Sequence, residues 1–274
     1  MPGPRRPRAR TSEPVTIDRK RLERFDVLDV GINPLTPSSA TKEIASLISE
    51  KRKGYVVFCT VSSILSARDD PEVARAIEGA ELVTPDGMPL VWLGRRRSPQ
   101  RVERVYGPDF MLDFFAATGA QFSHYFYGGQ PGVAETAVVR LRKRFPDLQV
   151  AGYSTPPVDV SATADDDNAI RAINASGADI VWVGLGHPKQ DLWMSTNLEH
   201  LNASVLAGVG AAFDFHAGHK KEAPGWMKKS GLQWLHRLAS EPRRLWRRYL
   251  VGNTRFLFHL SLRIIRGTQG KAHG

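Results

Sequence analysis

Seven short apolar runs, separated by segments of helical periodicity, occupy the chain between residues 27 and 210. Runs that are continuously apolar, rather than alternating, are typical of strands whose two faces are both covered by helices. We therefore predict an α/β fold, a Rossmann-like and mostly parallel sheet with helices on both faces and a helical C-terminal appendage. The predicted strands are 27–32, 55–61, 81–85, 124–129, 149–154, 179–186 and 204–210, and the predicted helices are 39–51, 71–79, 109–118, 132–144, 165–175 and 189–201.

The bulk composition bounds the class of protein. A chain of 274 residues that is 42% hydrophobic can bury the core of one large domain. The single cysteine, Cys59, excludes an internal disulfide framework and is typical of a reducing compartment. The N-terminal segment lacks the apolar core of a signal peptide, and no apolar run reaches the length of a membrane span. We expect a cytoplasmic protein.

The net charge of +10 is concentrated at the two ends of the chain. Residues 1–24 hold eight Lys/Arg against three Asp/Glu, and residues 237–274 hold nine against one. The body between them is slightly acidic, whereas a nucleic-acid-binding domain more often spreads its basic residues over the folded surface. We predict a disordered basic tail at 1–24, an α/β domain at 25–212 and an appendage at 213–274, and we do not expect a nucleic-acid partner.

The appendage begins as a loop and continues as two helices, the second opened by Glu241-Pro242. A basic amphipathic helix of this kind suits an anionic membrane surface, because its apolar side can enter the headgroup boundary. A helix that docks on its own core and leaves a basic side in water is the equal alternative. The expected basic side holds Arg248, Arg255, His259, Arg263 and Arg266, and the expected apolar side holds Leu250, Phe256, Leu257, Leu260 and Ile264.

Two predicted strands end in polar side chains, where ligands of parallel sheets gather. Thr60 and Ser62 follow the 55–61 strand, and they either contact a ligand or cap the next helix. Asp86 follows the 81–85 strand and precedes Gly87. Its carboxylate could accept a proton from an attacking hydroxyl, although Asp-Gly is also a common turn pair.

Two glycine-containing loops follow later strands. In FYGGQPG, Gly128 and Gly129 precede a predicted helix whose free N–H groups could bind a diphosphate. In VGLGHPKQDLW, Gly186 permits close backbone approach, and Lys189 and Gln190 follow it. Lysine suits a phosphate, and glutamine suits the polar groups of uracil or a sugar. Ordinary loops and exposed helix starts are the alternative for both.

The remaining acidic and histidine residues indicate no metal site. Asp109 is either a substrate contact or a charge at a helix N-terminus. Asp214, His216 and His219 lack a further cluster with the spacing of a metal site. The acidic run 165–167 lies at a predicted helix start, which is a poor place for a cation. We expect neither a metal nor a cofactor.

Six stretches, in order, resemble the WecG/TagA/CpsF glycosyltransferase family: TPDGMPLVW, RVYGPDFM, FYGGQPGVAETA, DIVWVGLGHPKQDLW, GVGAAFDFHAG and APGWMKKSGLQWLHRLASEPRRLWRR. The resemblance implies an inverting, metal-independent enzyme at the inner face of the plasma membrane, where it is peripheral. Its donor would be a UDP-sugar carrying an N-acetylmannosamine-type or related hexose. Its acceptor would be a polyprenyl-diphosphate-linked sugar of cell-surface polysaccharide synthesis. The donor hexose, the acceptor and the oligomeric state, a homo-oligomer included, stay open.

The resemblance also implies roles for single residues. Asp86 matches the proposed catalytic base, Thr60 a threonine thought to contact substrate, and Gln190 a glutamine near the sugar nucleotide. Arginines of the family's appendage, proposed to stabilise the diphosphate, match Arg237, Arg244 and Arg247. This chain departs from the family pattern at Ser62, Pro89, Asp191 and Gln233.

The arginine-rich run from Arg237 to Tyr249 can therefore serve two anions. Departing UDP carries extra negative charge, and guanidinium groups match phosphate oxygens in geometry. We assign Arg237, Arg244 and Arg247 to that charge, and we assign Arg248, Arg255, Arg263 and Arg266 to lipid headgroups. Nucleic-acid binding through arginines beside Trp246 and Tyr249 is the competing hypothesis. A nicotinamide-dependent oxidoreductase is disfavoured, because no GxGxxG follows the first strand.

Overall fold

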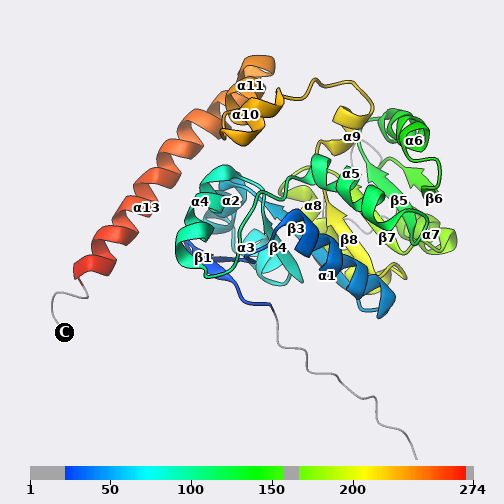
Figure 1. The fold of residues 1–274 in the computed structure, drawn as a ribbon, viewed down its shortest axis with the longest axis horizontal. Coiled ribbons are helices and arrows are strands. Elements are labelled where there is room, and N and C mark those ends of the chain that lie inside the picture. The colour runs from blue at the N-terminus through cyan, green and yellow to red at the C-terminus, as the bar shows by residue number, and fades with distance from the viewer. Residues whose placement is uncertain (1–21, 157–166, 270–274) are drawn as a thin grey trace, which may run out of the picture.

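A computed structural model describes residues 22–156 and 167–269 of the chain. Within these ranges six strands form one all-parallel sheet in the order β4-β3-β8-β7-β5-β6 (Figure 1). The predicted α/β architecture is confirmed. The strands are β3 (Gly54–Cys59), β4 (Leu82–Pro85), β5 (Ser123–Gly128), β6 (Gln149–Ser154), β7 (Ile180–Gly184) and β8 (Val205–Gly208).

Helices cover both faces of this sheet. Val57 and Cys59 of β3 face one layer, and Val56 and Phe58 face the other. The first layer consists of α2 (Val61–Asp69), α3 (Pro71–Glu78), α4 (Met88–Arg97), α7 (Asp167–Ser176) and α8 (Lys189–Asn197). The second layer consists of α1 (Pro37–Ser49), α5 (Gly107–Thr118), α6 (Val133–Arg144) and α9 (Ala212–His216).

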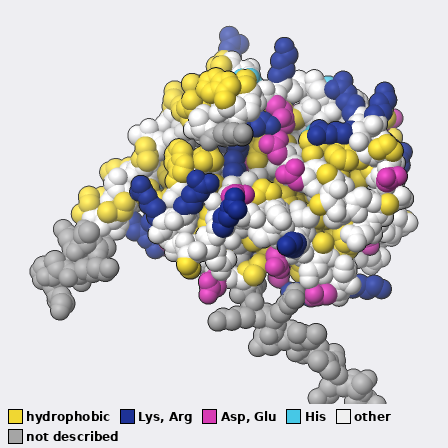
Figure 2. All heavy atoms as spheres, viewed as in Figure 1, with side chains coloured by type: hydrophobic (Ala, Val, Ile, Leu, Met, Phe, Trp, Pro, Cys, Tyr) yellow, Lys and Arg dark blue, Asp and Glu magenta, His cyan; other side chains and the backbone are white. Residues whose placement is uncertain are grey.

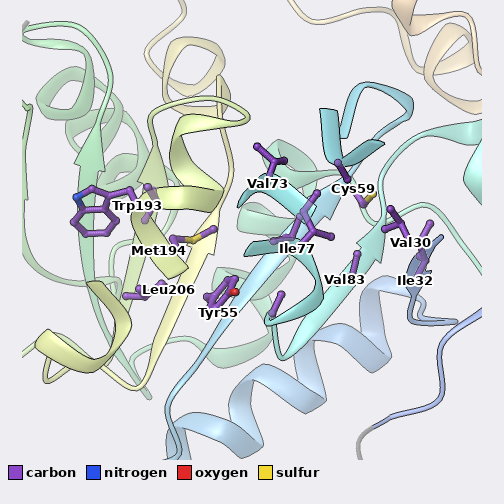
Figure 3. Close-up of a cluster of buried hydrophobic side chains, with 14 of the residues drawn as sticks. Val30, Ile32, Tyr55, Cys59, Val73, Ile77, Val83, Trp193, Met194 and Leu206 are labelled. Carbon is purple, nitrogen blue, oxygen red and sulfur yellow. The ribbon is translucent and has the colours of Figure 1, made fainter. Parts of the chain in front are cut away.

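The core explains why the strands read as continuous apolar runs. All six residues of β3 are buried, because helices lie above and below the strand. In the first layer, Tyr55, Val83 and Leu206 of the sheet lie beneath Val73 and Ile77 of α3 (Figure 3). Burial of each such side chain contributes roughly 1.5–3 kcal/mol. The strand ends are therefore held in fixed positions.

The prediction of one strand over residues 27–32 is wrong. Two short strands, β1 (Phe25–Val27) and β2 (Val30–Ile32), pair antiparallel in a hairpin outside the main sheet. Leu28 and Asp29 form its two-residue turn with positive φ values of 52° and 73°. Such turns usually carry asparagine or glycine, so this sequence gives no sign of one.

Three helices of the two layers, α2, α4 and α9, were not among the predicted elements. The predicted helix 189–201 ends earlier than expected, since α8 stops at Asn197 and a 3₁₀ turn covers Leu198–His200. Sequence periodicity is least informative at such boundaries and in short helices that mix serine, glycine and arginine with apolar residues.

The appendage consists of helical segments that lie beyond the sheet and along one side of the body (Figure 1). Pro242 opens a helix, as predicted, and the helix continues through a π-helical turn. The segments are α10 (Gly225–Lys229), α11 (Gln233–Ser240), α12 (Pro242–Trp246), the π turn (Arg247–Val251) and α13 (Gly252–Gln269).

Helix α13 docks on the body through a mixed face. Phe256 is 2% exposed and packs in the first-layer core, where Leu260 joins it. Arg255 forms an ion pair with Asp69, and Arg263 pairs with Asp29 at 2.8 Å. These arginines face the body, which corrects the expectation that they form an outward basic side. The side chain of Arg266 lies outside the described residues.

The outward side of the appendage is apolar instead. We call this surface the apolar stripe, and seven exposed side chains define it: Trp246, Leu250, Val251, Leu257, Phe258, Ile264 and Ile265 (Figure 2). Residues seven apart share a helical side, so Leu257 and Ile264 follow Leu250 and not Phe256. The residues predicted to form one apolar side therefore lie on two sides of the helix. Leu250, Leu257 and Ile264 face outward, whereas Phe256 and Leu260 pack on the body. No described helix is long and apolar enough to cross a bilayer.

The predicted basic tail, 1–24, lies mostly outside the described residues, which begin at Leu22. Arg24 belongs to the body, since its guanidinium donates a hydrogen bond to the carbonyl oxygen of Glu78 at 3.2 Å.

Docking of α13 can be tested by proteolysis. We expect Phe256→Ala to release the helix, because removing a buried phenylalanine side chain costs about 3–5 kcal/mol. Limited trypsin digestion should then cleave α13 at least tenfold faster than in the wild type. Phe258→Ala, at a side chain that is 60% exposed, is the matched control and should cleave at the wild-type rate. Equal cleavage of both variants would contradict this docking.

Candidate active site

Asp86 lies at the carboxyl end of β4, next to the end of β3. Its backbone N–H donates to the carbonyl oxygen of Cys59 at 3.0 Å, which joins the two strand ends. Gly87 is the N-cap of α4 and has an extended backbone, with φ −78° and ψ 134°. Asp86 therefore stands at a strand-to-helix junction and not in a reversing turn, and its carboxylate faces the edge where ligands of parallel sheets bind.

We name the cavity around this carboxylate the Asp86 pocket. Its walls come from the ends of β3 and β4, from the segment before α5 and from the appendage. Thr60, Ser62 and Arg104 line it from the body, and Arg237 and Arg248 line it from the appendage. Residues more than 180 positions apart in the chain thus share one cavity.

Arg104 holds Asp86 in place. Its guanidinium donates to a carboxylate oxygen of Asp86 at 3.1 Å and to the backbone carbonyl of the same residue at 2.5 Å. The guanidinium also lies 4.3 Å from the ring centroid of Tyr106. The side chain of Asp86 is thus oriented from one side and open to the pocket on another.

Burial raises the pKa of Asp86 above its usual range, because the charged carboxylate loses water. The nearby Arg104, Arg237 and Arg248 oppose this shift and favour the ionised form. A buried carboxylate that has a raised pKa and lies beside cations is suited to accept a proton near neutral pH.

Three residues that line the Asp86 pocket each have a buried polar atom without a hydrogen-bond partner among the described residues. These atoms are the hydroxyl oxygen of Tyr106, the side-chain carbonyl oxygen of Gln233 and Nε of Arg248. Buried polar groups usually have partners, so these atoms indicate a place for a polar ligand. A hydroxyl-rich molecule with an anionic group would complement all three.

Thr60 and Ser62 both line this pocket, as their position at a strand end predicted. Thr60 is also the N-cap of α2, where its hydroxyl oxygen accepts from the backbone N–H of Ser63 at 3.4 Å. The capping alternative is confirmed for Thr60. Capping leaves the residue at the cavity wall, so the two interpretations are compatible.

A second cavity, the Lys189 pocket, lies at the ends of β5, β7 and β8. Gly129 and Gly186 line it, and both have positive φ values, 78° and 79°. Gly128 is not part of the lining: a Cβ there would lie 2.6 Å from the backbone of Gly184, so glycine is needed for strand packing. Lys189, Lys220 and Arg244 supply positive charge to the cavity.

Gln190 is buried, with 5% exposure, and its amide is occupied by the backbone. Its oxygen accepts from the N–H of Gly186 at 3.1 Å and of Gly210 at 2.9 Å, and its nitrogen donates to the carbonyl of Gly208 at 2.6 Å. Gln190 lies beneath the Lys189 pocket and outside its lining. The structure thus makes it the brace of two loops, whereas the sequence suggested a direct ligand contact.

The appendage arginines separate into three environments. Arg237 faces the Asp86 pocket, while Arg244 faces the Lys189 pocket and pairs with Glu241 at 2.6 Å. Arg247 is exposed and lies over the ring of Trp246, outside both linings. Arg248, which we had assigned to lipid, lines the Asp86 pocket. The helix break at Glu241-Pro242 separates Arg237 from Arg244, because it changes the direction in which later side chains point.

The remaining sequence candidates have structural partners. Asp109 lies in the first turn of α5 and pairs with Lys228 at 2.8 Å, outside both pockets. His216 donates from its ring to the carbonyl oxygen of Pro108 at 3.1 Å. In the described part of the chain, no three His, Cys, Asp or Glu side chains form a metal-binding group. Residues 165 and 166 of the acidic run lie outside it.

Sequence reasoning missed Arg104, Lys220 and Arg248 as site residues. Arg104 begins the stretch RVYGPDFM, which carries part of the family resemblance, so a signal was present. Lys220 lies in a segment without periodicity, and Arg248 is one of five arginines in thirteen residues. Only the path of the chain distinguishes these two from their neighbours.

Comparison with known families gives a match that spans most of the chain. Residues 25–270 match the Glycosyl transferase WecG/TagA/CpsF family. The match includes β1, the whole sheet and nearly all of the appendage. Both pockets therefore lie within the matched region.

The brace made by Gln190 can be tested through stability. We expect Gln190→Leu to lower the free energy of unfolding by roughly 2–4 kcal/mol, because it leaves buried backbone groups unpaired. Urea unfolding at pH 7 would measure the change. Lys189→Gln, at the exposed neighbouring position, should change stability by less than about 0.5 kcal/mol. A Gln190→Leu protein as stable as the wild type would exclude the bracing role.

Proposed function

The chain belongs to the WecG/TagA/CpsF glycosyltransferase family, and from that premise we propose that it transfers a hexose from a UDP-sugar to a polyprenyl-diphosphate-linked sugar. The transferred hexose is of the N-acetylmannosamine type or a related one, and the reaction inverts its anomeric centre. One observation carries the proposal: a buried carboxylate, Asp86, lies in a pocket with Arg104, Arg237 and Arg248, and a second, glycine-lined cationic pocket opens at the carboxyl ends of other strands of the same sheet.

The Lys189 pocket suits the donor nucleotide. Gly129 and Gly186 allow the backbone to approach a ligand closely, and Lys189, the first residue of α8, lines the same cavity. Lys189, Lys220 and Arg244 add cations of the kind that bind diphosphate oxygens. Gln190 acts here through the loops that it braces.

Asp86 is the proposed base of the reaction. Its carboxylate removes the proton from the acceptor hydroxyl, whose oxygen then forms a bond to the anomeric carbon of the donor. The bond between that carbon and the phosphate oxygen breaks at the same time, and UDP departs with the electron pair. Attack from the side opposite the leaving group inverts the centre.

Protein cations are proposed to neutralise the departing diphosphate without a metal. Arg244, Lys189 and Lys220 line one cavity, where they can meet the charge as it develops. A single donor of this kind is typically worth about 3–4 kcal/mol in rate. Arg247, which lies outside both linings, is left out of this role.

The proposed base predicts a specific pH dependence. Activity should fall as pH is lowered through the pKa of Asp86, since only the ionised form accepts a proton. Because burial raises this pKa, the acidic limb of the pH profile should lie above the ordinary carboxyl range of about 4. Asp86→Asn should lower kcat by roughly 10²–10⁴-fold. Arg104→Gln should move the limb to higher pH, because Arg104 lowers the pKa of Asp86.

The assay uses a panel of UDP-hexoses with a short polyprenyl-diphosphate-linked sugar acceptor, across pH 4–9. Asp113→Asn is the matched control, because burial also raises the pKa of this carboxyl, which lies outside the Asp86 pocket. It should leave both kcat and the acidic limb unchanged. Absence of turnover with every donor would contradict the proposed activity. Full activity of Asp86→Asn would contradict the proposed role of Asp86 as the base.

We further propose that the enzyme is peripheral at the inner face of the plasma membrane, where a lipid-linked acceptor resides. The apolar stripe supports this, because seven large apolar side chains are exposed on the appendage (Figure 2). Arg243 and Arg247 are exposed beside Trp246 and can meet anionic headgroups. Arg255 and Arg263 serve instead to orient α13 by pairing with the body.

Vesicle binding tests the membrane proposal. Leu257→Glu and Phe258→Glu should each reduce cosedimentation with phosphatidylglycerol vesicles by about tenfold or more, because a charge replaces burial worth roughly 1.5–3 kcal/mol. Val139→Glu changes a similarly exposed side chain on α6, at 51% exposure, and should bind as the wild type does. Undiminished binding by both stripe variants would rule out the stripe as the attachment surface.

A further inference from the structure

Arg237 and Arg248 face the Asp86 pocket without a carboxylate of their own. No ion pair joins either guanidinium to an acidic side chain within residues 22–156 and 167–269. Nε of Arg248 is buried and has no hydrogen-bond partner in the same two ranges. Asp86, the acidic residue of the lining, is already held by Arg104 at 3.1 Å.

The lining of this pocket therefore has an unbalanced charge. Three guanidinium groups, of Arg104, Arg237 and Arg248, face one carboxylate, which leaves an excess of two positive charges. Arg237 and Arg248 also repel one another, and Arg248 loses water on burial. Such a cluster is costly unless an anion binds there, so the pocket is complementary to a group with about two negative charges.

The Lys189 pocket differs in this respect. Arg244 pairs with Glu241, and Lys220 lies 3.5 Å from both Asp214 and Glu241. These cations are held in an ion-pair network, with Lys189 exposed beside them. The two cavities thus form separate anion sites of different construction, and helices α11 and α12 each contribute an arginine to one of them.

We propose that Arg237 and Arg248 bind the diphosphate of the lipid-linked acceptor, while the diphosphate of the nucleotide donor occupies the Lys189 pocket with Arg244. The inference rests on the proposed function, because it needs two substrates that each carry a diphosphate. A diphosphate that links a lipid to a sugar carries two negative charges near neutral pH, which matches the excess in the Asp86 pocket.

The position of Asp86 supports the acceptor as the occupant. The reacting hydroxyl belongs to the sugar that is bonded directly to this diphosphate, so the base and the anion site must lie within one cavity. Asp86 and the two arginines do so. Tyr106 and Gln233, which also line the pocket, each add a buried polar atom that has no hydrogen-bond partner in the described part of the chain.

The path open to the lipid chain also supports the acceptor as the occupant of the Asp86 pocket. Arg248 and Tyr249 of the π turn line the pocket, whereas the next two residues, Leu250 and Val251, are exposed on the apolar stripe. A diphosphate bound by Arg248 therefore lies one helical turn from the surface proposed to enter the bilayer. An isoprenoid chain attached to it can leave the cavity directly into that surface.

Calorimetric titration of the full-length protein with two probes tests this assignment. UDP represents the donor diphosphate, and farnesyl diphosphate represents the lipid end of the acceptor. In the wild type the two should bind together, with neither displacing the other. Arg248→Gln should weaken the affinity for farnesyl diphosphate by about 10–100-fold, because each charge-assisted contact to phosphate contributes strongly to affinity. The affinity for UDP should change by less than twofold.

Arg244→Gln should give the opposite pattern, with a weaker affinity for UDP and an unchanged affinity for farnesyl diphosphate. Arg248→Lys should recover part of the affinity for farnesyl diphosphate, and its melting temperature confirms folding. Arg96→Gln removes one exposed charge from α4, outside both linings, and should not change the affinity for either probe.

Competition between UDP and farnesyl diphosphate in the wild type would overturn the assignment, as would loss of UDP affinity in Arg248→Gln. Neither result depends on turnover. Failure of the proposed function is seen separately, as absence of sugar transfer by the wild type with any donor. The two ideas can therefore fail independently.

Discussion

Asp86 is removed from most of the surrounding water, because it lies at the edge of a sheet that is buried on both faces. Arg104 orients it by bonding both its carboxylate and its backbone carbonyl. This contact ties the end of β4 to the segment before α5, and so it shapes the wall of the pocket. The other groups of the site, including Arg237 and Arg248 from the appendage, are arranged around a carboxylate that is already fixed.

The appendage completes a site that the sheet alone leaves open. Helix α11 brings Arg237 to the Asp86 pocket, and α12 brings Arg244 to the Lys189 pocket. A continuous helix would place these residues, seven positions apart, on nearly the same side. The break at Glu241-Pro242 separates them, which allows one short arginine-rich segment to serve two cavities.

Helix α13 uses its two sides for different purposes. Phe256 and two ion pairs hold it on the body, while large apolar side chains face outward. The exposed ion pairs are worth at most about 1 kcal/mol each, so burial of Phe256 supplies more of the docking energy. The orientation of the helix keeps the apolar stripe and the opening of the Asp86 pocket close to one another.

The sequence by itself determined the elements whose cause is local. Continuous apolar runs predicted the six parallel strands, and strand-end position identified Thr60, Asp86 and the glycine loops. Tertiary structure decided the rest, because the partners are remote in the chain. Arg104 meets Asp86 from 18 residues away, and Gln190 is occupied by backbone groups up to 20 residues away. The helix break at Glu241-Pro242 places Arg237 and Arg244 at different cavities, which their spacing alone does not reveal.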